Sequence, residues 1–143
     1  MATRNGSAEW KGDLKGGSGT VKVGDGVFEG NYSFASRFED GDGTNPEELL
    51  AAAHAGCFAM ALSLILGEDG HTPESLRAQA KAQLRNVDGN PTIARIDLEV
   101  EGSVPGIDEE AFRGYAEKAK EGCVVSRALA GVPEIELTAS LAG

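Results

Sequence analysis

Cysteine is scarce in this 143-residue sequence, which holds only Cys57 and Cys123. Two cysteines are too few for a disulfide framework, so the fold must be held by an ordinary core. Basic residues are also few, with 13 Lys and Arg against 23 Asp and Glu, for a formal net charge of −10. Phosphate binding relies on Lys and Arg, so this balance argues against nucleic acid and anionic lipid as partners.

An apolar leader is also lacking, because residues 1–14 are mostly small and polar. No secretory signal is visible there, and we expect a cytoplasmic protein. In a reducing compartment two cysteines are thiols, and a disulfide between them is usually transient and catalytic. The length predicts a single domain over residues 1–143.

The longest uncharged run, Leu49–Leu66, is long enough to span a membrane. Three features favour a buried core helix instead. The run is rich in Ala and Gly, it contains His54 and Ser63, and acidic residues rather than basic anchors flank both of its ends. We therefore expect no membrane partner.

The pattern along the chain predicts an α+β fold with largely antiparallel pairing. Residues 76–84 alternate apolar and polar side chains, which predicts a strand although the residue types favour helix. A break in alternation at Ala94-Arg95 predicts a β-bulge. The predicted strands are 8–11, 19–23, 27–34, 76–84, 93–100 and 134–141, and the predicted helices are 45–66, 109–120 and 124–129.

The central helix has clear start and stop signals. Asn45 is a good N-cap, Pro46 occupies the favoured first position, Glu48 completes a capping-box pattern and Gly67 is a plausible stop. The helix is apolar on every face, so we expect it to be buried. Its many small residues allow close approach of a second helix, and a chain this short can hardly surround it, which predicts an intimate homodimer.

Cys57, near the middle of that helix, is the first candidate for chemistry. Burial raises a thiol pKa, and the dipole of the helix fades within its first turn, so an active Cys57 thiolate needs a nearby cation. Arg37 is one candidate, and Glu47 is placed to hold its guanidinium through a two-point ion pair. His54, three residues before Cys57 on the same face, is a candidate base.

Each of these residues also has a structural interpretation. Cys57 is a small apolar core residue in that interpretation, His54 a packed histidine, and Arg37 a solvated loop residue. Cys123 follows Gly122 at the start of a predicted short helix, a position that lowers a thiol pKa. These arguments leave open which cysteine reacts first.

Two further classes of function stay open on the residues alone. Cys57, Cys123, His54 and His71 contain the ligand types of a zinc site, although only His54 and Cys57 are closely spaced. A non-enzymatic, stress-associated binding protein with inert buried thiols is the other alternative.

The sequence resembles the OsmC branch of the OsmC/Ohr peroxidases over nearly its whole length. The most specific match ends at the first cysteine, and a second surrounds the other cysteine. The matching segments are 10–14, 19–21, 37–39, 43–58, 60–63, 72–73, 104–107 and 119–126.

This resemblance implies a thiol-dependent peroxidase of oxidative and osmotic stress, which reduces organic hydroperoxides and, less well, hydrogen peroxide. By position, Cys57 is similar to the peroxidatic thiol and Cys123 to the resolving thiol, and the two would form a disulfide that an external dithiol reduces. Arg37 resembles the activating arginine and Glu47 its carboxylate partner. No metal or organic cofactor is implied.

The implied fold is an intertwined homodimer, in which six-stranded, largely antiparallel sheets surround long buried central helices and the active sites lie at the subunit interface. One departure is Val124, because many relatives have proline directly after the second cysteine.

Overall fold

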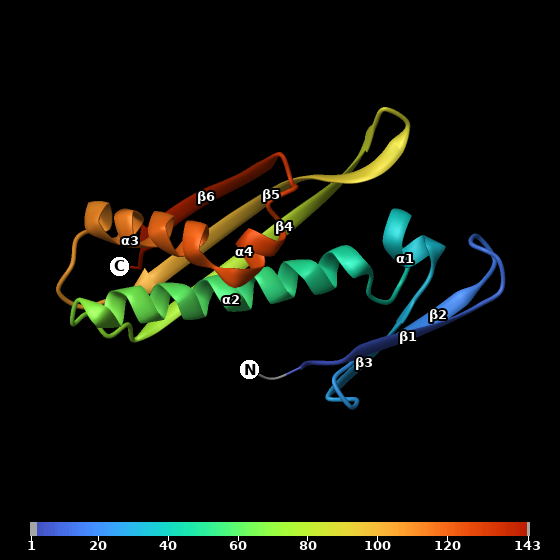
Figure 1. The fold of residues 1–143 in the computed structure, drawn as a ribbon, viewed down its shortest axis with the longest axis horizontal. Coiled ribbons are helices and arrows are strands. Elements are labelled where there is room, and N and C mark those ends of the chain that lie inside the picture. Colours follow the sequence, from blue (N-terminus) through green and yellow to red (C-terminus); the bar gives the residue numbers. More distant parts are fainter. Residues whose placement is uncertain (1–2, 143) are drawn as a thin grey trace. The chain divides into compact units, whose positions relative to one another are not determined.

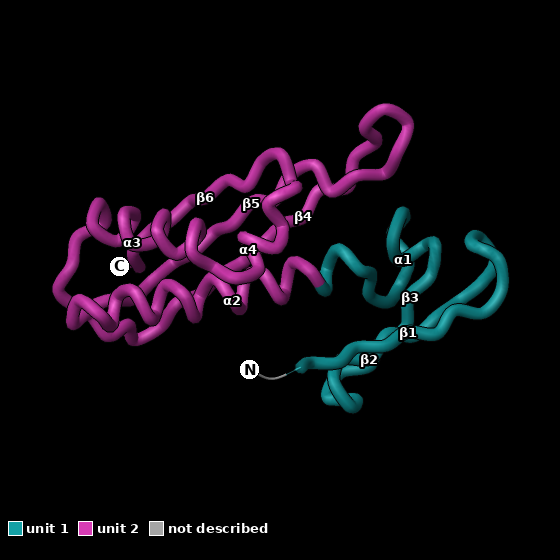
Figure 2. The backbone as a smooth tube through the Cα atoms, viewed as in Figure 1, with its two compact units in different colours: residues 1–49 teal, residues 50–143 magenta. Residues whose placement is uncertain are grey.

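The computed structural model describes residues 3–142 of the chain, which divide into two compact units. Unit 1 runs to Leu49 and unit 2 begins at Leu50 (Figure 2). The boundary falls inside the long helix α2, Pro46–Glu68, whose first turn belongs to unit 1. The two units are therefore described separately below.

Unit 1 contains a three-stranded antiparallel sheet in the order β1-β2-β3. The strands are Gly6–Lys11, Ser18–Val23 and Phe28–Tyr32, close to those predicted, except that the third ends earlier. Gly24 and Gly26 take positive φ angles of 60° and 107° in the turn between β2 and β3, as the Gly-Asp-Gly signal predicts.

A short helix that the sequence analysis missed follows β3 in unit 1. This helix, α1, spans Phe34–Phe38 and begins at Phe34, the last residue of the segment predicted as strand. A capping box starts it, because the Ser33 side chain accepts from the Ser36 N–H and the Ser36 hydroxyl lies 2.8 Å from the Ser33 nitrogen. The Ser-x-x-Ser spacing of a capping box was the sequence signal for this helix. The apolar Phe34 and Phe38 are also typical of a strand.

Both ends of α2 show how its limits are set. The Asn45 side-chain oxygen accepts from the Glu48 N–H at 2.8 Å, which confirms the predicted N-cap. The predicted stop at Gly67 is wrong. Gly70 takes the left-handed conformation, φ 83°, and His71 N–H bonds to the Leu66 carbonyl in a Schellman arrangement.

The sheet of unit 2 has the order β4-β5-β6, with bounds Ser75–Val87, Asn90–Ser103 and Glu134–Leu141 (Figure 1). Strand β4 confirms the alternation-based prediction. Arg95 faces Gln83 and Ile93 faces Leu84, so Ala94 is the extra residue of a bulge, as predicted. β4 and β5 are antiparallel and β5 and β6 are parallel. The helices between β5 and β6 form the crossover that a parallel pair requires.

Helices α3, Glu109–Gly122, and α4, Val124–Ala128, complete unit 2. One face of α3 is buried through Phe112, Ala116 and Ala119. These side chains join one core with the inward faces of α2 and β5. The core residues from α2 and β5 are Phe58, Leu62, Leu66, Ile96, Leu98 and Val100.

Two expectations about the fold refer to the homodimer, and a single chain does not test them. The described residues of one chain form two three-stranded sheets, so the six-stranded sheet stays a prediction. The central helix is buried along one stripe only, His54, Phe58, Leu62 and Leu66, spaced four residues apart. Its opposite face is exposed within a single chain.

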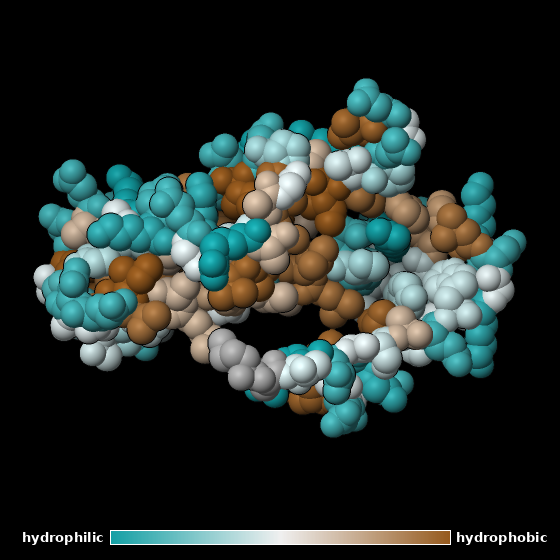
Figure 3. All heavy atoms as spheres, in the orientation of Figure 1, coloured by the Kyte–Doolittle hydropathy of each residue, from teal (hydrophilic) through white to brown (hydrophobic). Residues whose placement is uncertain are grey.

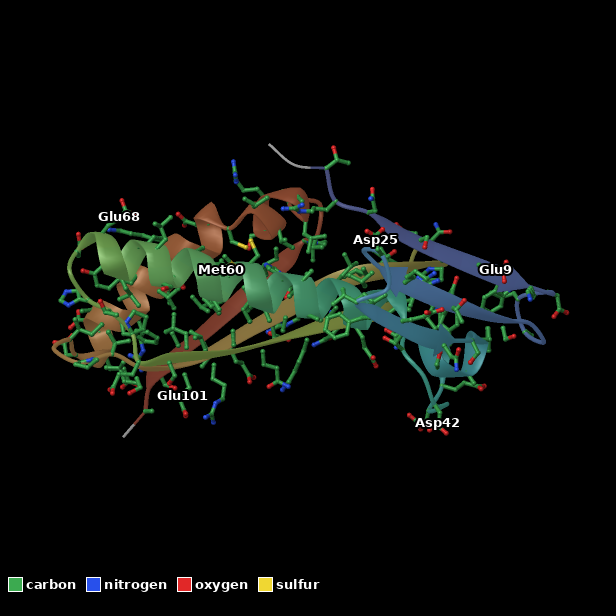
Figure 4. The ribbon with its side chains drawn as sticks, turned by 90° about the horizontal axis from the view of Figure 1, so that it is seen from below. Glu9, Asp25, Asp42, Met60, Glu68 and Glu101 are labelled. Atoms are coloured by element: carbon green, nitrogen blue, oxygen red, sulfur yellow. The ribbon has the colours of Figure 1, made fainter. Side chains whose placement is uncertain are left out.

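That exposed face of α2, which we call the outer stripe, is apolar or small throughout. Met60 is 77% exposed and Leu64 is 66% exposed. Met60 lies on the helix in Figure 4, and apolar surface over α2 appears brown in Figure 3. The residues of the outer stripe are Ala53, Gly56, Met60, Ser63, Leu64 and Gly67. In length and composition the helix could span a membrane, and core helices of soluble proteins share these two properties.

Candidate active site

The two cysteines of the chain come together in unit 2. Cys57 lies on α2 and is half-buried, whereas Cys123 is 1% exposed at the junction of α3 and α4. Cys123 is the N-cap residue of α4, so it lies where the free N–H groups of that helix begin. Its side chain makes no capping hydrogen bond, and the N–H groups act on its sulfur as oriented dipoles.

Burial and neighbouring polar groups act on the two thiols in opposite directions. Burial raises the pKa of the Cys57 thiol and the adjacent Cys123 raises it further, while the N–H groups of Val125 and Val124 oppose this rise. Burial also works to raise the pKa of Cys123. The Cys57 thiol, the N–H groups of Ser126 and Val125 and the Ser126 hydroxyl outweigh burial, and the pKa of Cys123 falls.

Unit 2 therefore makes Cys123 the more acidic thiol, as its place at the start of a helix predicts. The Val124 N–H is one of the donors beside Cys57. A proline at this position would remove that donor, so Val124 adds a small favourable contribution to the Cys57 thiolate.

His54 is completely buried beside this pair of thiols. Its Nε2 atom lies 2.7 Å from the Ser126 hydroxyl, across 72 positions of sequence. Burial lowers the pKa of His54, which keeps the imidazole neutral. Its other ring nitrogen, Nδ1, is buried and has no hydrogen-bond partner among the described residues. His54 is thus a buried, neutral histidine with a polar contact that the sequence analysis did not foresee.

Arg37 and Glu47 form a two-point ion pair in unit 1. Arg37 Nε lies 2.9 Å from Oε1 of Glu47, and Nη2 lies 3.0 Å from Oε2. The Glu47 side chain is 10% exposed and that of Arg37 is 37% exposed, so the guanidinium keeps one open side. Helix α1 carries the arginine and the first turn of α2 carries the glutamate. The predicted pairing is present, and its part in catalysis stays a prediction.

An apolar cavity of about 220 Å³ lies beside Arg37 in unit 1. Aromatic rings dominate its lining, and the ring of Phe38 lies 5.2 Å from the guanidinium carbon. Phe38 thus lines this cavity, whereas Phe58 on α2 is a fully buried core residue of unit 2. The other principal lining residues of the cavity are Trp10, Leu14, Tyr32 and Phe34.

The zinc alternative needs several ligands that converge on one point. Within residues 3–142, no three His, Cys, Asp or Glu side chains are grouped so that they could hold a metal ion. His71 contacts the Tyr115 ring, with centroids 5.9 Å apart, whereas His54 binds Ser126. His71 therefore contacts a different part of unit 2, and the thiol pair is the chemical centre of that unit.

The predicted site residues fall into two groups. Cys57 and Cys123 meet in unit 2, and Arg37 and Glu47 meet in unit 1. Ser126 is the polar residue that sequence reasoning overlooked. Its only available signal was its place three residues after Cys123, the spacing of an N-cap and its N3 partner.

Comparison with known proteins places the chain in a class. Residues 39–138 match the family model of the OsmC-like proteins. The chain therefore belongs to the OsmC-like protein family. Peroxiredoxin OsmC of Escherichia coli strain K12 is 51% identical over 127 residues, which cover 88% of this chain and 89% of the relative.

More distant relatives carry the same fold. The organic hydroperoxide resistance protein of Xanthomonas axonopodis pv. citri is 31% identical over 99 residues, 68% of each chain. The crystal structure of an organic hydroperoxide resistance protein from Elizabethkingia anophelis aligns with 100% of this chain and 97% of its own, at a TM-score of 0.71 and 25% identity. The OsmC/Ohr-like α+β fold expected from the sequence is thereby confirmed.

Proposed function

We propose that this protein is a thiol-dependent peroxidase that reduces organic hydroperoxides and, less well, hydrogen peroxide. The observation that carries the proposal is the meeting of Cys57 and Cys123, the only two cysteines of the chain, beside the first turn of α4. Similarity to a protein named Peroxiredoxin OsmC supports it.

Access decides which cysteine attacks the peroxide. Cys123 is the more acidic thiol, but it is 1% exposed, whereas Cys57 is half-buried. A peroxide oxygen must touch the sulfur that attacks it, so Cys57 is the peroxidatic thiol. Its thiolate displaces alcohol from the hydroperoxide and becomes a sulfenic acid.

Resolution follows between adjacent side chains. The Cys123 sulfur attacks the Cys57 sulfur, an S–S bond forms, and the sulfenic oxygen leaves as water with the proton of the Cys123 thiol. An external dithiol then restores both thiols by exchange. The chain has no CxxC motif that could supply this reductant itself.

Activation of Cys57 requires a cation, because burial and the adjacent Cys123 raise the pKa of its thiol. The Arg37–Glu47 ion pair supplies a guanidinium with an open side. The resemblance to the OsmC/Ohr peroxidases implies active sites at the subunit interface, so we assign activation of Cys57 to Arg37 of the partner subunit.

An intertwined homodimer provides that second copy. Every buried apolar side chain within residues 3–142 belongs to unit 2, so unit 1 has a sheet without a covered face of its own. A sheet of this size needs apolar cover to be stable. The outer stripe of α2 likewise needs a partner, and its small residues permit close helix packing. Two copies satisfy both needs and allow the three-stranded sheets to join into six-stranded ones.

The same reasoning makes residues 1–143 one folding domain, because unit 1 lacks a core with which to fold alone. The aromatic cavity beside Arg37 would receive the organic group of the hydroperoxide. We also propose a cytoplasmic location, where reduced thiol is the resting state.

The test is an intact-mass measurement after one equivalent of cumene hydroperoxide. The peroxidase predicts loss of two hydrogens, reversed by a dithiol. Cys57→Ser should abolish peroxide reduction, and Cys123→Ser should keep the first turnover while oxidised Cys57 accumulates. Unchanged mass in the wild type, or full activity of Cys57→Ser, would favour the alternative of a non-enzymatic binding protein with inert thiols.

A further inference from the structure

The contact between His54 and Ser126 lies beside the contact between the Cys57 and Cys123 thiols. On α2, His54 and Cys57 are three residues apart, so they share a face. On α4, Cys123 is the N-cap and Ser126 is the third helical residue, and side chains at these two positions lie next to each other. The two helices are thus joined by a thiol pair and by an imidazole–hydroxyl pair, one beside the other.

The imidazole–hydroxyl pair of His54 and Ser126 is shielded from solvent. Ser126 is 8% exposed and His54 is 0% exposed, and water does not reach Nδ1. Burying a polar pair of this kind costs desolvation free energy. The cost is largest when one of the imidazole nitrogens has no hydrogen-bond partner. A purely structural contact between α2 and α4 would be better served by apolar side chains.

The hydrogen-bond inventory indicates how the pair is oriented. A neutral imidazole has one N–H donor and one lone-pair acceptor. If Nε2 carries the hydrogen, it donates to the Ser126 oxygen at 2.7 Å, and the hydroxyl hydrogen is free to point at the neighbouring Cys123 sulfur. Nδ1 then carries a lone pair and no hydrogen, so no N–H group of His54 is left buried without an acceptor.

We propose that His54 and Ser126 are positioning residues for the resolving step, in which a neutral imidazole fixes the Ser126 hydroxyl toward the Cys123 sulfur. This inference rests on the proposed peroxidase reaction and adds a division of labour to it. Arg37 serves the attack of Cys57 on the peroxide, and the imidazole–hydroxyl pair serves the attack of Cys123 on the sulfenic acid. The hydroxyl stabilises the Cys123 thiolate, so a larger fraction of the resolving thiol is ready to react.

Electrons and protons balance without further reagents. The Cys123 thiolate donates the electron pair of the new S–S bond, and the Cys57 S–O bond breaks. The departing hydroxide takes the proton that the Cys123 thiol gave up and leaves as water. His54 stays neutral throughout, in keeping with its burial. Cys57 is the titratable group beside Cys123, and His54 acts on Cys123 only through Ser126.

Two Ser126 variants test the proposal. A hydrogen bond to a charged group is worth one to two pKa units, so Ser126→Ala in a Cys57→Ser background should raise the Cys123 pKa by about one unit, measured by thiolate absorbance. With both cysteines present, it should slow disulfide formation about tenfold near neutral pH, since the thiolate fraction falls by that factor. Ser126→Thr keeps the hydroxyl and should restore both values.

His54 is tested through the same two measurements. His54→Leu should slow disulfide formation, and His54→Gln, which keeps an N–H donor, should slow it less. Because His54 acts through Ser126, the double variant His54→Leu/Ser126→Ala should be no slower than Ser126→Ala alone. Oxidation of Cys57 by the peroxide, timed with a sulfenic-acid trap, should be no slower than in the wild type in any of these variants, because less ionised Cys123 opposes the Cys57 thiolate less.

The outcomes separate this inference from the proposed function. Failure of the wild-type protein to form a sulfenic acid would overturn the peroxidase itself. Normal Cys57 oxidation, together with an unchanged Cys123 pKa and wild-type disulfide formation in Ser126→Ala, would overturn only the positioning role. If His54→Leu does not fold, the Ser126→Ala and Ser126→Thr comparison decides alone. Loss of stability with both kinetic values unchanged would identify the pair as structural.

Discussion

Arg37 holds Glu47 through two parallel hydrogen bonds, 2.9 Å and 3.0 Å long, with the carboxylate nearly buried and the guanidinium partly open. This geometry fixes the plane of the guanidinium and leaves donors free on its other side. A capped first turn of α2 supports the carboxylate, and the five-residue helix α1 supports the arginine. The guanidinium of this pair is therefore held in a fixed orientation, with open donors that an anion can approach.

The first prediction concerns this cation. Arg37→Met should raise the Cys57 pKa by about two units, measured by thiolate absorbance in a Cys123→Ser background, because an opposite charge at contact shifts a pKa by that amount. Arg37→Lys keeps the positive charge but not the paired N–H donors of a guanidinium, and should give an intermediate Cys57 pKa. Peroxide reduction at neutral pH should fall in the same order.

Arg95 offers a matched control. It forms ion pairs with Asp97 and Glu134 on the outer face of the β4-β5-β6 sheet, on the strand side that does not enter the core. Arg95→Met should therefore leave the Cys57 titration as it is in the wild type. If Arg37→Met also leaves it unchanged, Arg37 has no part in activating the thiol.

The second prediction concerns the outer stripe of α2. Leu64→Glu places a charge at a position that is 66% exposed in one chain and buried in the proposed homodimer. Dissociation to monomers should follow, seen as a halved molar mass by light scattering, with loss of peroxidase activity because each site would lose Arg37 of the partner subunit.

The control for dimer dissociation is Val87→Glu. Val87 ends β4 beside the turn to β5, is 44% exposed, and is an apolar residue away from α2. It should leave the molar mass unchanged. A wild-type protein that is a stable, active monomer would contradict the homodimer and the assignment of Arg37 to the partner subunit together.

The third prediction is a pH dependence of stability. Burial lowers the pKa of His54 below 6.5, so the unfolded chain binds a proton that the folded chain resists. The contribution of His54 is fully present above about pH 6.5 and is lost as the pH falls below that value. The free energy of unfolding should drop by up to about 1.4 kcal/mol per pH unit on this account.

The measurement is urea unfolding between about pH 5 and pH 7 for the wild type and His54→Gln. Carboxylates titrate in both proteins, so their contribution cancels in the difference between the two curves. That difference should shrink as the pH falls. His71→Gln removes a histidine outside the contact between α2 and α4 and controls for the loss of one imidazole. Parallel curves for the wild type and His54→Gln would refute the prediction.

Local signals in the sequence were sufficient for most elements. Alternation alone identified β4, although its Ala, Gln, Lys and Arg favour helix, because burial of one face outweighs intrinsic propensity. The closeness of Arg37 and Glu47 in sequence suggested their pairing, since Arg37 comes shortly before α2 and Glu47 lies in its first turn. The N-cap of α2 was predicted correctly. The stop at Gly67 was not, because the left-handed residue that follows the last turn is Gly70.

Contacts between distant segments were not readable. His54 meets Ser126 across 72 positions, and no local pattern connects them. The parallel pairing of β5 with β6 depends on where the crossover through α3 and α4 ends. A helix that is apolar on all faces is expected to be buried, but a single chain covers only the stripe from His54 to Leu66. Burial of its other face depends on the proposed homodimer.

The last prediction tests the packing that sets α3 on the sheet. A Cβ atom at Gly102, on β5, would lie 2.5 Å from Phe112 Cζ and 2.7 Å from its Cε1. Phe112 is fully buried, so neither ring nor strand has room to move. Gly102→Ala should therefore lower the free energy of unfolding by about 1–3 kcal/mol, the usual cost of overpacking.

Gly114 provides the opposite case on the same pair of elements. It lies in the interior of α3, is exposed, and a Cβ atom there would meet nothing within 4 Å. Gly114→Ala should raise the free energy of unfolding by up to about 1 kcal/mol, since glycine is a poor helix former. Both variants should be unfolded in urea at one protein concentration, because assembly adds to apparent stability. A Gly102→Ala protein as stable as the wild type would show that β5 and Phe112 are not in close contact in solution.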